Sequence, residues 1–263
     1  MPKGLFPMKL IAFGKTHTGK VRLNNEDNFL ILDVGKKKLG DIDDPRFLTD
    51  GIFLVVADGM GGAAAGEKAS EFVINTAMTI AIENKTGSDA DEISYLAIKE
   101  AIHECKKYTK RHPEMIGMGS VATYAYFFKK NLYITQVGDT RLYLHRDKEL
   151  TQITEDQNLV TELLKLRMIT PDQAQFHPQK NAVTQAIGAT DDLNPISYRV
   201  NLQVGDKLLI CSDGLTGMVS DLEIQSILES SNNNFNAIEN LIDTANENGG
   251  VDNITVVLAE IVK

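Results

Sequence analysis

The expected order of helices and strands along this chain is compatible with only a few folds. Short runs rich in β-branched and aromatic residues, bounded by Gly, Asp or Asn, predict the strands. These runs are KLIAFG, NFLILD, IFLVVA, SVATYAYFF, LYITQVG, RLYLH, KLLICS and NITVVLAEIV. Helical periodicity after Ser, Asn or Asp caps predicts helices at 66–84, 89–111, 222–229 and 235–248. The helices therefore form two consecutive groups, one after the early strands and one before the last strand.

This order argues against a parallel doubly wound sheet, which needs strands and helices to alternate. Asn131 is a candidate hairpin turn between two strand runs, and the segment VGDT at 137–140 joins two more, so antiparallel pairing is favoured. We predict an α+β fold in which two antiparallel sheets pack face to face, with helix pairs on the outside.

The bulk composition is that of an ordinary globular protein and argues against some partners. With 263 residues, 43% hydrophobic and 24% charged, the chain is long enough for one large domain or two small ones. Its net charge of -9 opposes broad attraction to nucleic acid or to anionic membranes, because both are polyanions. We therefore expect no nucleic-acid partner.

Cysteine usage and the N-terminal segment both suggest a reducing cytosol. Cys105 lies in a helical segment and Cys211 ends an apolar run, so both are expected to be reduced thiols, buried or half-buried. The N-terminal MPKGLFPMKLIAF lacks the apolar core of a signal peptide. No apolar run approaches the roughly 20 residues of a spanning helix. The expected location is cytoplasmic, without membrane insertion.

The glycine-rich turn after the strand IFLVVA has two interpretations. Asp58 follows this run and precedes GMGG, so that Gly59, Gly61 and Ala64 match the G-x-G-x-x-A pattern of a dinucleotide-binding turn. That fold needs an acid about 20 residues further on, at the tip of the next strand. The candidate, Glu83, falls within a predicted helix, and a second helix follows in place of a strand. The dinucleotide interpretation is therefore the weaker one, and a metal site is the alternative.

Acidic residues occur at strand ends throughout the chain, and together they indicate a metal site. A single aspartate at such a position is usually a turn former or a helix cap. Several converging carboxylates would repel one another unless cations neutralised them. Oxygen ligands without a Cys or His cluster select hard ions such as Mg²⁺ or Mn²⁺. The acids concerned are Glu26, Asp27, Asp58, Asp139, Asp213 and Asp252.

Glycine and arginine neighbours of these acids support the same interpretation. Gly59 and Gly214 each follow an aspartate, and a residue without Cβ allows a sharp turn and the close approach of its carbonyl to an ion. Arg22, four residues before the first acid, offers a planar, permanently charged group suited to a phosphate. Alone, Arg22 would be a surface cation or an ion-pair partner. Beside the acid set it completes a phosphoryl site.

Five segments, in order along the chain, resemble the metal-dependent protein phosphatase family, type 2C, and its compact bacterial branch in particular. They are GKVRLNNEDN, VVADGMGG, VGDTRLYL with the following LTQITEDQNLV, LLICSDGLTGMV, and GGVDNITVVL. TQAIGAT also resembles a family element, and together the segments cover nearly the whole chain. The resemblance implies a four-layer αββα sandwich. It also implies a single catalytic domain over 1–263, with a flap subdomain at about 156–182.

The resemblance further implies roles for the acids in a binuclear Mn²⁺ or Mg²⁺ centre. Asp58 would bridge the two ions, and the carbonyl of Gly59 would ligate one of them. Asp213 and Asp252 would bind the other ion. Asp139 would help Asp213 to hold a third, weaker metal.

The implied activity is the hydrolysis of phosphoserine and phosphothreonine in proteins. Arg22 would hold the substrate phosphate, while Glu26 and Asp27 would contact the metal centre directly or through water. Water activated by the two ions would attack phosphorus directly, so that no phosphoenzyme forms. The expected partners are phosphorylated proteins and a cognate Ser/Thr kinase of the bacterial type, whose signalling the enzyme would reverse. We expect the chain to be a monomer.

Departures from the family pattern concern the proton donor. Some members, chiefly eukaryotic ones, carry a histidine after the Asp-Gly, whereas this chain has Met60, as bacterial members commonly do. Gln157 stands where relatives often have the histidine of TEDHS. Protonation of the leaving group would then come from water on the metals. The five histidines of the chain are expected at the surface or in packing, and His177 in the flap is the one to test.

The segment 33–50, DVGKKKLGDIDDPRFLTD, is a longer connection than relatives often have at this place. Its three lysines at 36–38, followed by Asp41, Asp43 and Asp44, are expected to form a solvated hairpin tip. Binding of a partner or a regulatory contact is the lesser alternative.

Two other functions compete with a general protein phosphatase. A stress-signalling phosphatase devoted to one anti-sigma-factor antagonist would ignore generic phosphopeptides. A non-catalytic binding module that kept the fold would bind no Mn²⁺. The presence of Asp58, Asp213 and Asp252 argues against this second alternative, because a degenerate site does not need three buried carboxylates.

Overall fold

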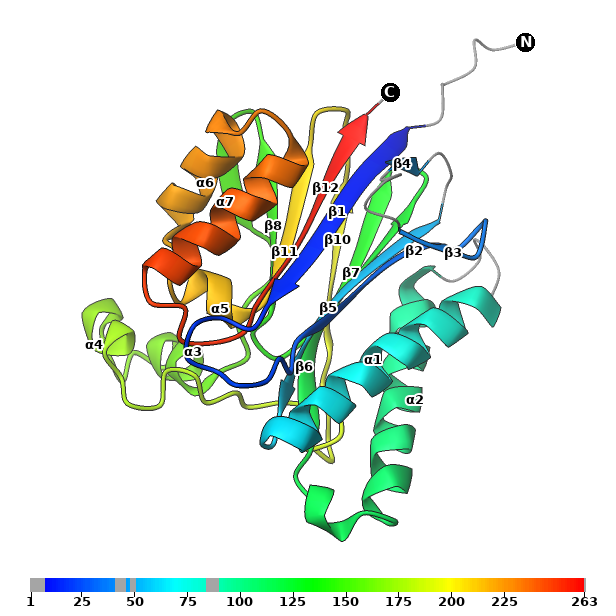
Figure 1. The fold of residues 1–263 in the computed structure, drawn as a ribbon, viewed down its shortest axis with the longest axis vertical. Coiled ribbons are helices and arrows are strands. Elements are labelled where there is room, and N and C mark those ends of the chain that lie inside the picture. Colours follow the sequence, from blue (N-terminus) through cyan, green and yellow to red (C-terminus); the bar gives the residue numbers. More distant parts are fainter. Residues whose placement is uncertain (1–7, 41–45, 48–50, 84–89, 263) are drawn as a thin grey trace.

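The computed structural model describes residues 8–40, 46–47, 51–83 and 90–262. Within these ranges, two six-stranded antiparallel sheets pack face to face, and helices cover both outer faces (Figure 1). This arrangement confirms the predicted α+β sandwich with its αββα layers. No helix in the described part of the chain combines the length and the apolar character needed to cross a bilayer.

The first sheet brings together the two ends of the described chain. β12 (Ile254–Val262) lies between β1 (Lys9–His17) and β11 (Lys207–Cys211) and pairs with β1 along its whole length. The strand order is β4-β1-β12-β11-β8-β9. The remaining strands are β4 (Arg46–Phe47), β8 (Arg141–Arg146) and β9 (Glu149–Gln152).

The second sheet has the strand order β10-β7-β6-β5-β2-β3. Its strands are β10 (Ile196–Asn201), β7 (Asn131–Val137), β6 (Gly119–Phe128), β5 (Ile52–Met60), β2 (Asn28–Asp33) and β3 (Lys38–Leu39). In β5, Phe53 and Val55 face the outer helices, whereas Leu54 and Val56 face the first sheet. Successive side chains of a strand point to opposite faces, so a strand covered on both sides must be apolar at every position. The apolar run therefore ends where the core ends, just before Asp58.

Two groups of helices cover the outer faces of the sandwich (Figure 1). The second sheet is covered by α1 (Ala63–Glu83) and α2 (Ala90–Thr109), and the first by α5 (Asp213–Thr216), α6 (Asp221–Ser230) and α7 (Asn234–Glu247). Ser220 and Glu223 form a capping box that begins α6, and Asn233 caps α7. These caps match the Ser and Asn signals expected before the two late helices.

The segment 156–182 forms two short helices at one end of the sandwich, close to α5 (Figure 1). They are α3 (Leu159–Lys165) and α4 (Pro171–Gln175), and a short 3₁₀ helix, η1 (Pro113–Met115), follows α2. Asn158 caps α3, while Thr170 and Gln173 form a capping box at α4. Local capping therefore fixes these short helices, which the sequence pattern did not reveal.

The two predicted hairpins have different outcomes. β6 and β7 form the predicted antiparallel hairpin, but its turn lies at 129–130, where Lys129 has a φ of 57°, and Asn131 is the first residue of β7. The segment VGDT joins no hairpin, because β7 belongs to the second sheet and β8 to the first. In this crossing Gly138 has a φ of 90°, and a Cβ there would collide with Val121. The crossing carries Asp139 to the boundary between the two sheets.

The segment 33–50 contributes to both sheets. β3 pairs with β2, which places the three lysines at 36–38 at an exposed hairpin tip, as predicted. β4 pairs with β1 in the other sheet. Asp41, Asp43 and Asp44 lie outside the described residues. The length of the connection thus follows from its path between the edges of two sheets.

Candidate metal centre

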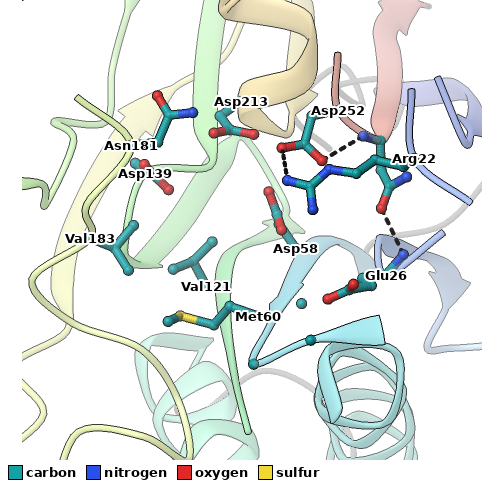
Figure 2. A pocket seen from close by; sticks show the side chains of 14 residues that line it. Arg22, Glu26, Asp58, Met60, Val121, Asp139, Asn181, Val183, Asp213 and Asp252 are labelled. Carbon is teal, nitrogen blue, oxygen red and sulfur yellow. Dashed lines mark hydrogen bonds and ion pairs between the residues drawn. The ribbon is translucent and has the colours of Figure 1, made fainter. Parts of the chain in front are cut away.

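Five of the six predicted acids line one cavity of about 250 Å³ at the end of the sandwich. They come from loops or strand ends that belong to both sheets, and Figure 2 shows carboxylates on several sides of the cavity. The residues are Glu26, Asp58, Asp139, Asp213 and Asp252, together with the predicted Arg22 and Gly59.

Burial and mutual repulsion raise the pKa values of these carboxyl groups. For Asp58, Asp139 and Asp213, burial is the largest cause, and neighbouring carboxylates raise each pKa further. Burial also raises the pKa of Glu26, which Arg22 partly offsets. A cavity that penalises its own negative charge in this way gains free energy when cations enter it. The donor set, which is entirely oxygen, fits Mn²⁺ or Mg²⁺.

In the described part of the chain, the cavity acids do not bring three ligand atoms within 4.8 Å of one another. Three ligand atoms do lie this close together in Glu100, His103 and Glu104 of α2. The α2 group is largely exposed, and such acidic groups are common without an ion, so it is not a candidate site.

Arg22 lies at the rim of the cavity and forms an ion pair with one of its acids. Its Nη2 donates to Oδ2 of Asp252 at 2.7 Å, and its side chain is 51% exposed. The hydrogen bond to Asp252 raises the pKa of Arg22, so the guanidinium stays charged. A charged, half-exposed guanidinium beside the carboxylates can bind a phosphate that enters from solvent.

Asn253 holds the loop that carries Arg22. Its Nδ2 donates to the carbonyls of Thr18 and Asn24, both at 2.9 Å, and its Oδ1 accepts from the backbone N–H of Glu26 at 2.8 Å. Asn253 is 4% exposed, so these bonds are made away from water. The Asn253 side chain thereby fixes this loop beside Asp252, the acid that directly precedes Asn253 before β12.

Asp27 is the one predicted ligand that does not line the cavity. It is 7% exposed, and its Oδ2 accepts a hydrogen bond of 2.7 Å from Oγ of Ser212. Ser212 in turn accepts from the backbone N–H of Thr255 at 3.0 Å. These contacts support a positioning role for Asp27 beneath Asp213. Contact of Asp27 with the ions stays a prediction.

Gly59 occupies a place where no side chain fits. A Cβ there would collide with the carbonyl oxygen of Gly66 and with the backbone of Glu26. Gly66 is equally constrained, because its Cβ would meet the carboxylate of Glu26. The two glycines let α1 pack directly against the acid-bearing loop, which explains part of the glycine-rich pattern after Asp58.

Gln157 fixes the crossing between the two sheets that carries Asp139. From the sequence, we noted only that it replaces a histidine of relatives and cannot serve as the proton donor. The Oε1 atom of Gln157 accepts from the backbone N–H of Gly138 at 2.6 Å, and the backbone N–H of Gln157 donates to the Gly138 carbonyl at 2.9 Å. Its Nε2 donates to the carbonyl of Asn194. Gln157 is therefore a buried positioning residue, and the amide can accept and donate as these bonds require.

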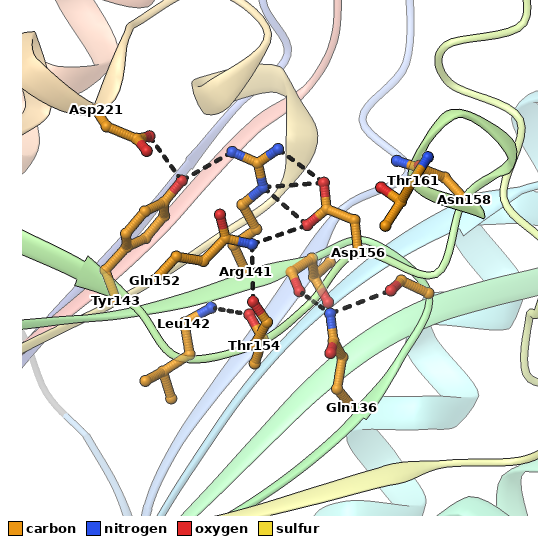
Figure 3. Close-up of polar contacts among 12 residues, drawn as sticks. Gln136, Arg141, Leu142, Tyr143, Gln152, Thr154, Asp156, Asn158, Thr161 and Asp221 are labelled. Carbon is orange, nitrogen blue, oxygen red and sulfur yellow. Dashed lines mark hydrogen bonds and ion pairs between the residues drawn. The ribbon is translucent and has the colours of Figure 1, made fainter. Parts of the chain in front are cut away.

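A buried ion pair links the start of the 156–182 segment to the first sheet (Figure 3). Arg141 donates from Nε to Oδ1 of Asp156 at 2.9 Å and from Nη2 to Oδ2 at 2.7 Å. Its Nη1 donates to the hydroxyl of Tyr143, which donates to Asp221. Burial opposes the charge of Arg141, but these partners outweigh it and raise its pKa. Burial and neighbouring carboxylates raise the pKa of the nearby Asp139, and Arg141 offsets part of that rise.

The remaining wall of the cavity carries no proton donor. Figure 2 shows Met60, Val121 and Val183 on this side, with Asn181 near the acids. None of the five histidines lines the cavity. His177, which we singled out, accepts from the backbone N–H of Gln179.

Sequence reasoning missed Asn253, Ser212 and Asn181. Asn253 and Ser212 are each adjacent in the chain to a predicted ligand, and this adjacency was the available signal. Asn181 had no such signal, because it lies in the segment 156–182, far from any predicted acid in sequence.

Comparisons with known proteins identify relatives of the chain. A family model described as Protein phosphatase 2C matches residues 45–259 of the chain. The serine/threonine phosphatase stp of Listeria welshimeri is 36% identical over 250 residues, which cover 94% of this chain and 94% of stp.

Solved structures give the same picture at the level of the fold. The crystal structure of the Mycobacterium tuberculosis serine/threonine phosphatase PstP/Ppp has a TM-score of 0.84 and 32% identity, and the match covers 97% of this chain and 100% of that one. The catalytic domain of PstP in complex with two manganese ions has a TM-score of 0.82 and 31% identity, with coverage of 97% and 100%.

Proposed function

The chain belongs to the protein phosphatase 2C family, and from this premise we propose how its residues work in a metal-dependent phosphoserine/phosphothreonine protein phosphatase. The observation that carries the proposal is the convergence of Arg22 with five carboxylates around one cavity. A phosphate and its counter-ions need this combination of one fixed cation and several oxygen ligands.

The proposed metal ligands are the acids and the glycine that line the cavity. Asp58 would bridge two ions, the carbonyl of Gly59 would ligate one of them, and Asp213 and Asp252 would hold the other. Asp139 would help Asp213 to hold a third, weaker ion. When bound, Mn²⁺ or Mg²⁺ lowers the pKa of water and neutralises the phosphate. The PstP structure with two manganese ions supports this stoichiometry.

The residues around the ions bind and orient the substrate. Arg22 binds the phosphate oxygens, and Glu26 and Asp27 hold the metal centre from the side of the β2 loop. Met60 lies where a proton donor would stand, and a thioether has no proton to give, so this position supplies no general acid.

No covalent phosphoenzyme is proposed, and the thiols support this view. Cys105 and Cys211 are both buried, and neither lines the cavity. Burial raises the pKa of Cys105 to about 11 and that of Cys211 to about 12, which keeps both protonated near neutral pH. A protonated, buried thiol is a poor nucleophile.

The proposed substrates are phosphorylated proteins, with a bacterial Ser/Thr kinase as the source of their phosphate. We also propose that residues 1–263 form a single catalytic domain, that the protein is a monomer and that it is located in the cytoplasm. The short helices of 156–182, which lie beside the cavity, support the idea that this segment is a flap.

The test is turnover of phosphoserine, phosphothreonine and phosphotyrosine peptides, measured in parallel with and without Mn²⁺. We expect metal-dependent hydrolysis of the first two, and its loss in Asp58→Asn. Full activity of Asp58→Asn would disprove the proposed role of Asp58. The absence of hydrolysis of any peptide would disprove the protein phosphatase function.

A further inference from the structure

A second cavity lies beside the metal centre and continues from it. We call it the flank cavity. Its volume is about 500 Å³, twice that of the catalytic cavity, and both are lined by Asp139, Asn181, Asp213 and Asp252. A substrate whose phosphate is bound among the acids therefore has a direct path into the flank cavity.

The flank cavity has apolar walls on two sides. One wall is formed by the short helices of 156–182, and the other by the residues that follow α5 and precede Asp252. The apolar lining residues are Val160, Leu164, Pro171, Ala174, Met218 and Val251. Val251 is 48% exposed although it directly precedes a metal-centre acid, so the described chain leaves about half of its surface uncovered. Apolar surface at this place is available to a ligand.

Two charged residues on the polar floor of the flank cavity, Arg141 and Asp156, are paired with each other. Arg141 and Asp156 neutralise each other through two parallel hydrogen bonds, and Gln152 donates to Asp156 at 3.0 Å (Figure 3). Asn158 accepts from the backbone N–H of Thr161. The Arg141–Asp156 pair offers no net charge to an incoming side chain, and Asp139, Asp213 and Asp252 lie on the side of the metal centre. The apolar walls, whose residues do not line the metal centre, favour a neutral side chain.

We propose that the flank cavity binds an aliphatic side chain next to the phosphorylated residue of a protein substrate. The proposal rests on the proposed phosphatase function. The occupant is the substrate chain itself, because the cavity is continuous with the place where the phosphate is bound. Its volume falls within the roughly 300–1,000 Å³ typical of ligand pockets and exceeds the need of one aliphatic side chain with its backbone.

One lining residue favours a different kind of substrate. Lys180 also lines the flank cavity and is exposed, so a substrate with an acidic residue beside the phosphorylated one is the alternative. The apolar residues outnumber this single cation and lie on both walls, which is why the aliphatic flank is preferred here. A peptide series separates the two.

The test uses phosphothreonine peptides that differ only in one flanking residue. Leu, Gly, Asp and Lys are placed in turn on the N-terminal and then on the C-terminal side of the phosphothreonine. We expect kcat/KM with Leu to exceed that with Gly, Asp or Lys by roughly tenfold on one side, as for other apolar pockets. Each value is divided by kcat/KM for p-nitrophenyl phosphate, which has no flanking residue.

Two variants connect the preference to the flank cavity. Leu164→Asp places a charge on its wall and is expected to reduce the preference for Leu to about twofold or less. Leu166→Asp is the matched control, because Leu166 directly follows α3, is 70% exposed and does not line the cavity. Thr161→Trp fills the same wall without a charge and should act like Leu164→Asp, which keeps the test valid if that variant does not fold.

The outcomes are distinct. Equal kcat/KM for all flanks, a preference for Asp, or a preference for Leu that survives in both wall variants would overturn the proposal. Turnover of p-nitrophenyl phosphate without turnover of any phosphopeptide would overturn the proposed protein phosphatase function, and the flank cavity proposal with it.

Discussion

Replacing Asp156 by Asn removes the charge opposite Arg141 and keeps the shape of the side chain. The Arg141 and Asp156 side chains are 25% and 10% exposed, so the pair is largely buried. Removing one partner of a buried pair costs about 3–5 kcal/mol, because the other charge stays buried without compensation. Arg141 keeps some contact with water and lies near Asp139, so we expect the lower end, about 3 kcal/mol.

The loss is measured by urea unfolding and by thermal unfolding, both in EDTA so that metal binding does not contribute. At about 2–4 °C per kcal/mol for a chain of this size, Tm should fall by about 6–12 °C. Glu155→Gln is the matched control at the neighbouring position. Glu155 pairs with Lys165, and these side chains are 51% and 58% exposed, so its loss should cost less than about 1 kcal/mol.

A double variant tests the physical reason. If the cost of Asp156→Asn comes from the unpaired cation, Arg141→Met combined with Asp156→Leu should be more stable than Asp156→Asn alone. A loss in Asp156→Asn no larger than that of the Glu155→Gln control would refute the reasoning. So would a double variant that is less stable than the single one.

Three further predictions concern the site. Asn253→Leu removes three hydrogen bonds from the loop that carries Arg22, so KM for a phosphopeptide at saturating Mn²⁺ should rise by at least roughly tenfold; an unchanged KM in a variant that keeps its fold would contradict this role. EDTA should abolish turnover. Mn²⁺ should raise the Tm of the metal-free protein, since the ion relieves carboxylate repulsion, and the rise should be smaller in Asp213→Asn. Equal Tm shifts in the two proteins would exclude Asp213 as a ligand. Because burial raises the pKa values of Cys105 and Cys211 to about 11 and about 12, folded protein at about pH 8 should resist iodoacetamide, whereas urea-unfolded protein should react at both thiols, and rapid labelling of the folded protein would count against this.

The fold could be predicted where strands are buried on both faces and helices are long. β5 is apolar at every buried position, and α1 and α2 are each about twenty residues long, so their signals are strong. β10 was missed because it lies at a sheet edge and alternates half-buried and exposed residues without a clear apolar face. The VGDT crossing was misjudged because a glycine turn shows that the chain reverses, and not which sheet receives the next strand.

The acids of the site could be predicted because their chemistry shows in the residue type, whereas the residues that position them could not. Asn253 bonds to backbone groups more than two hundred positions away, and Ser212 bonds to Asp27 across a similar separation. Such partners are set by the tertiary fold, and adjacency to a predicted ligand marks the two residues without showing what they bond to. Gln157 was considered only as the residue that replaces the histidine of relatives and so removes a candidate proton donor, and its bonds to Gly138 depend on a crossing that the sequence did not reveal.

Three positioning residues of this site share one property, and electrostatics explains it. Asn253, Ser212 and Gln157 are neutral groups that bond through amides or a hydroxyl. A buried lysine or arginine in their place would neutralise the nearby carboxylates and compete with the ions for them. Arg141 is consistent with this reasoning, because its charge is largely balanced by Asp156 and therefore acts only weakly on Asp139. The acids therefore keep their mutual repulsion, and that repulsion is the part of the site that divalent ions relieve on binding.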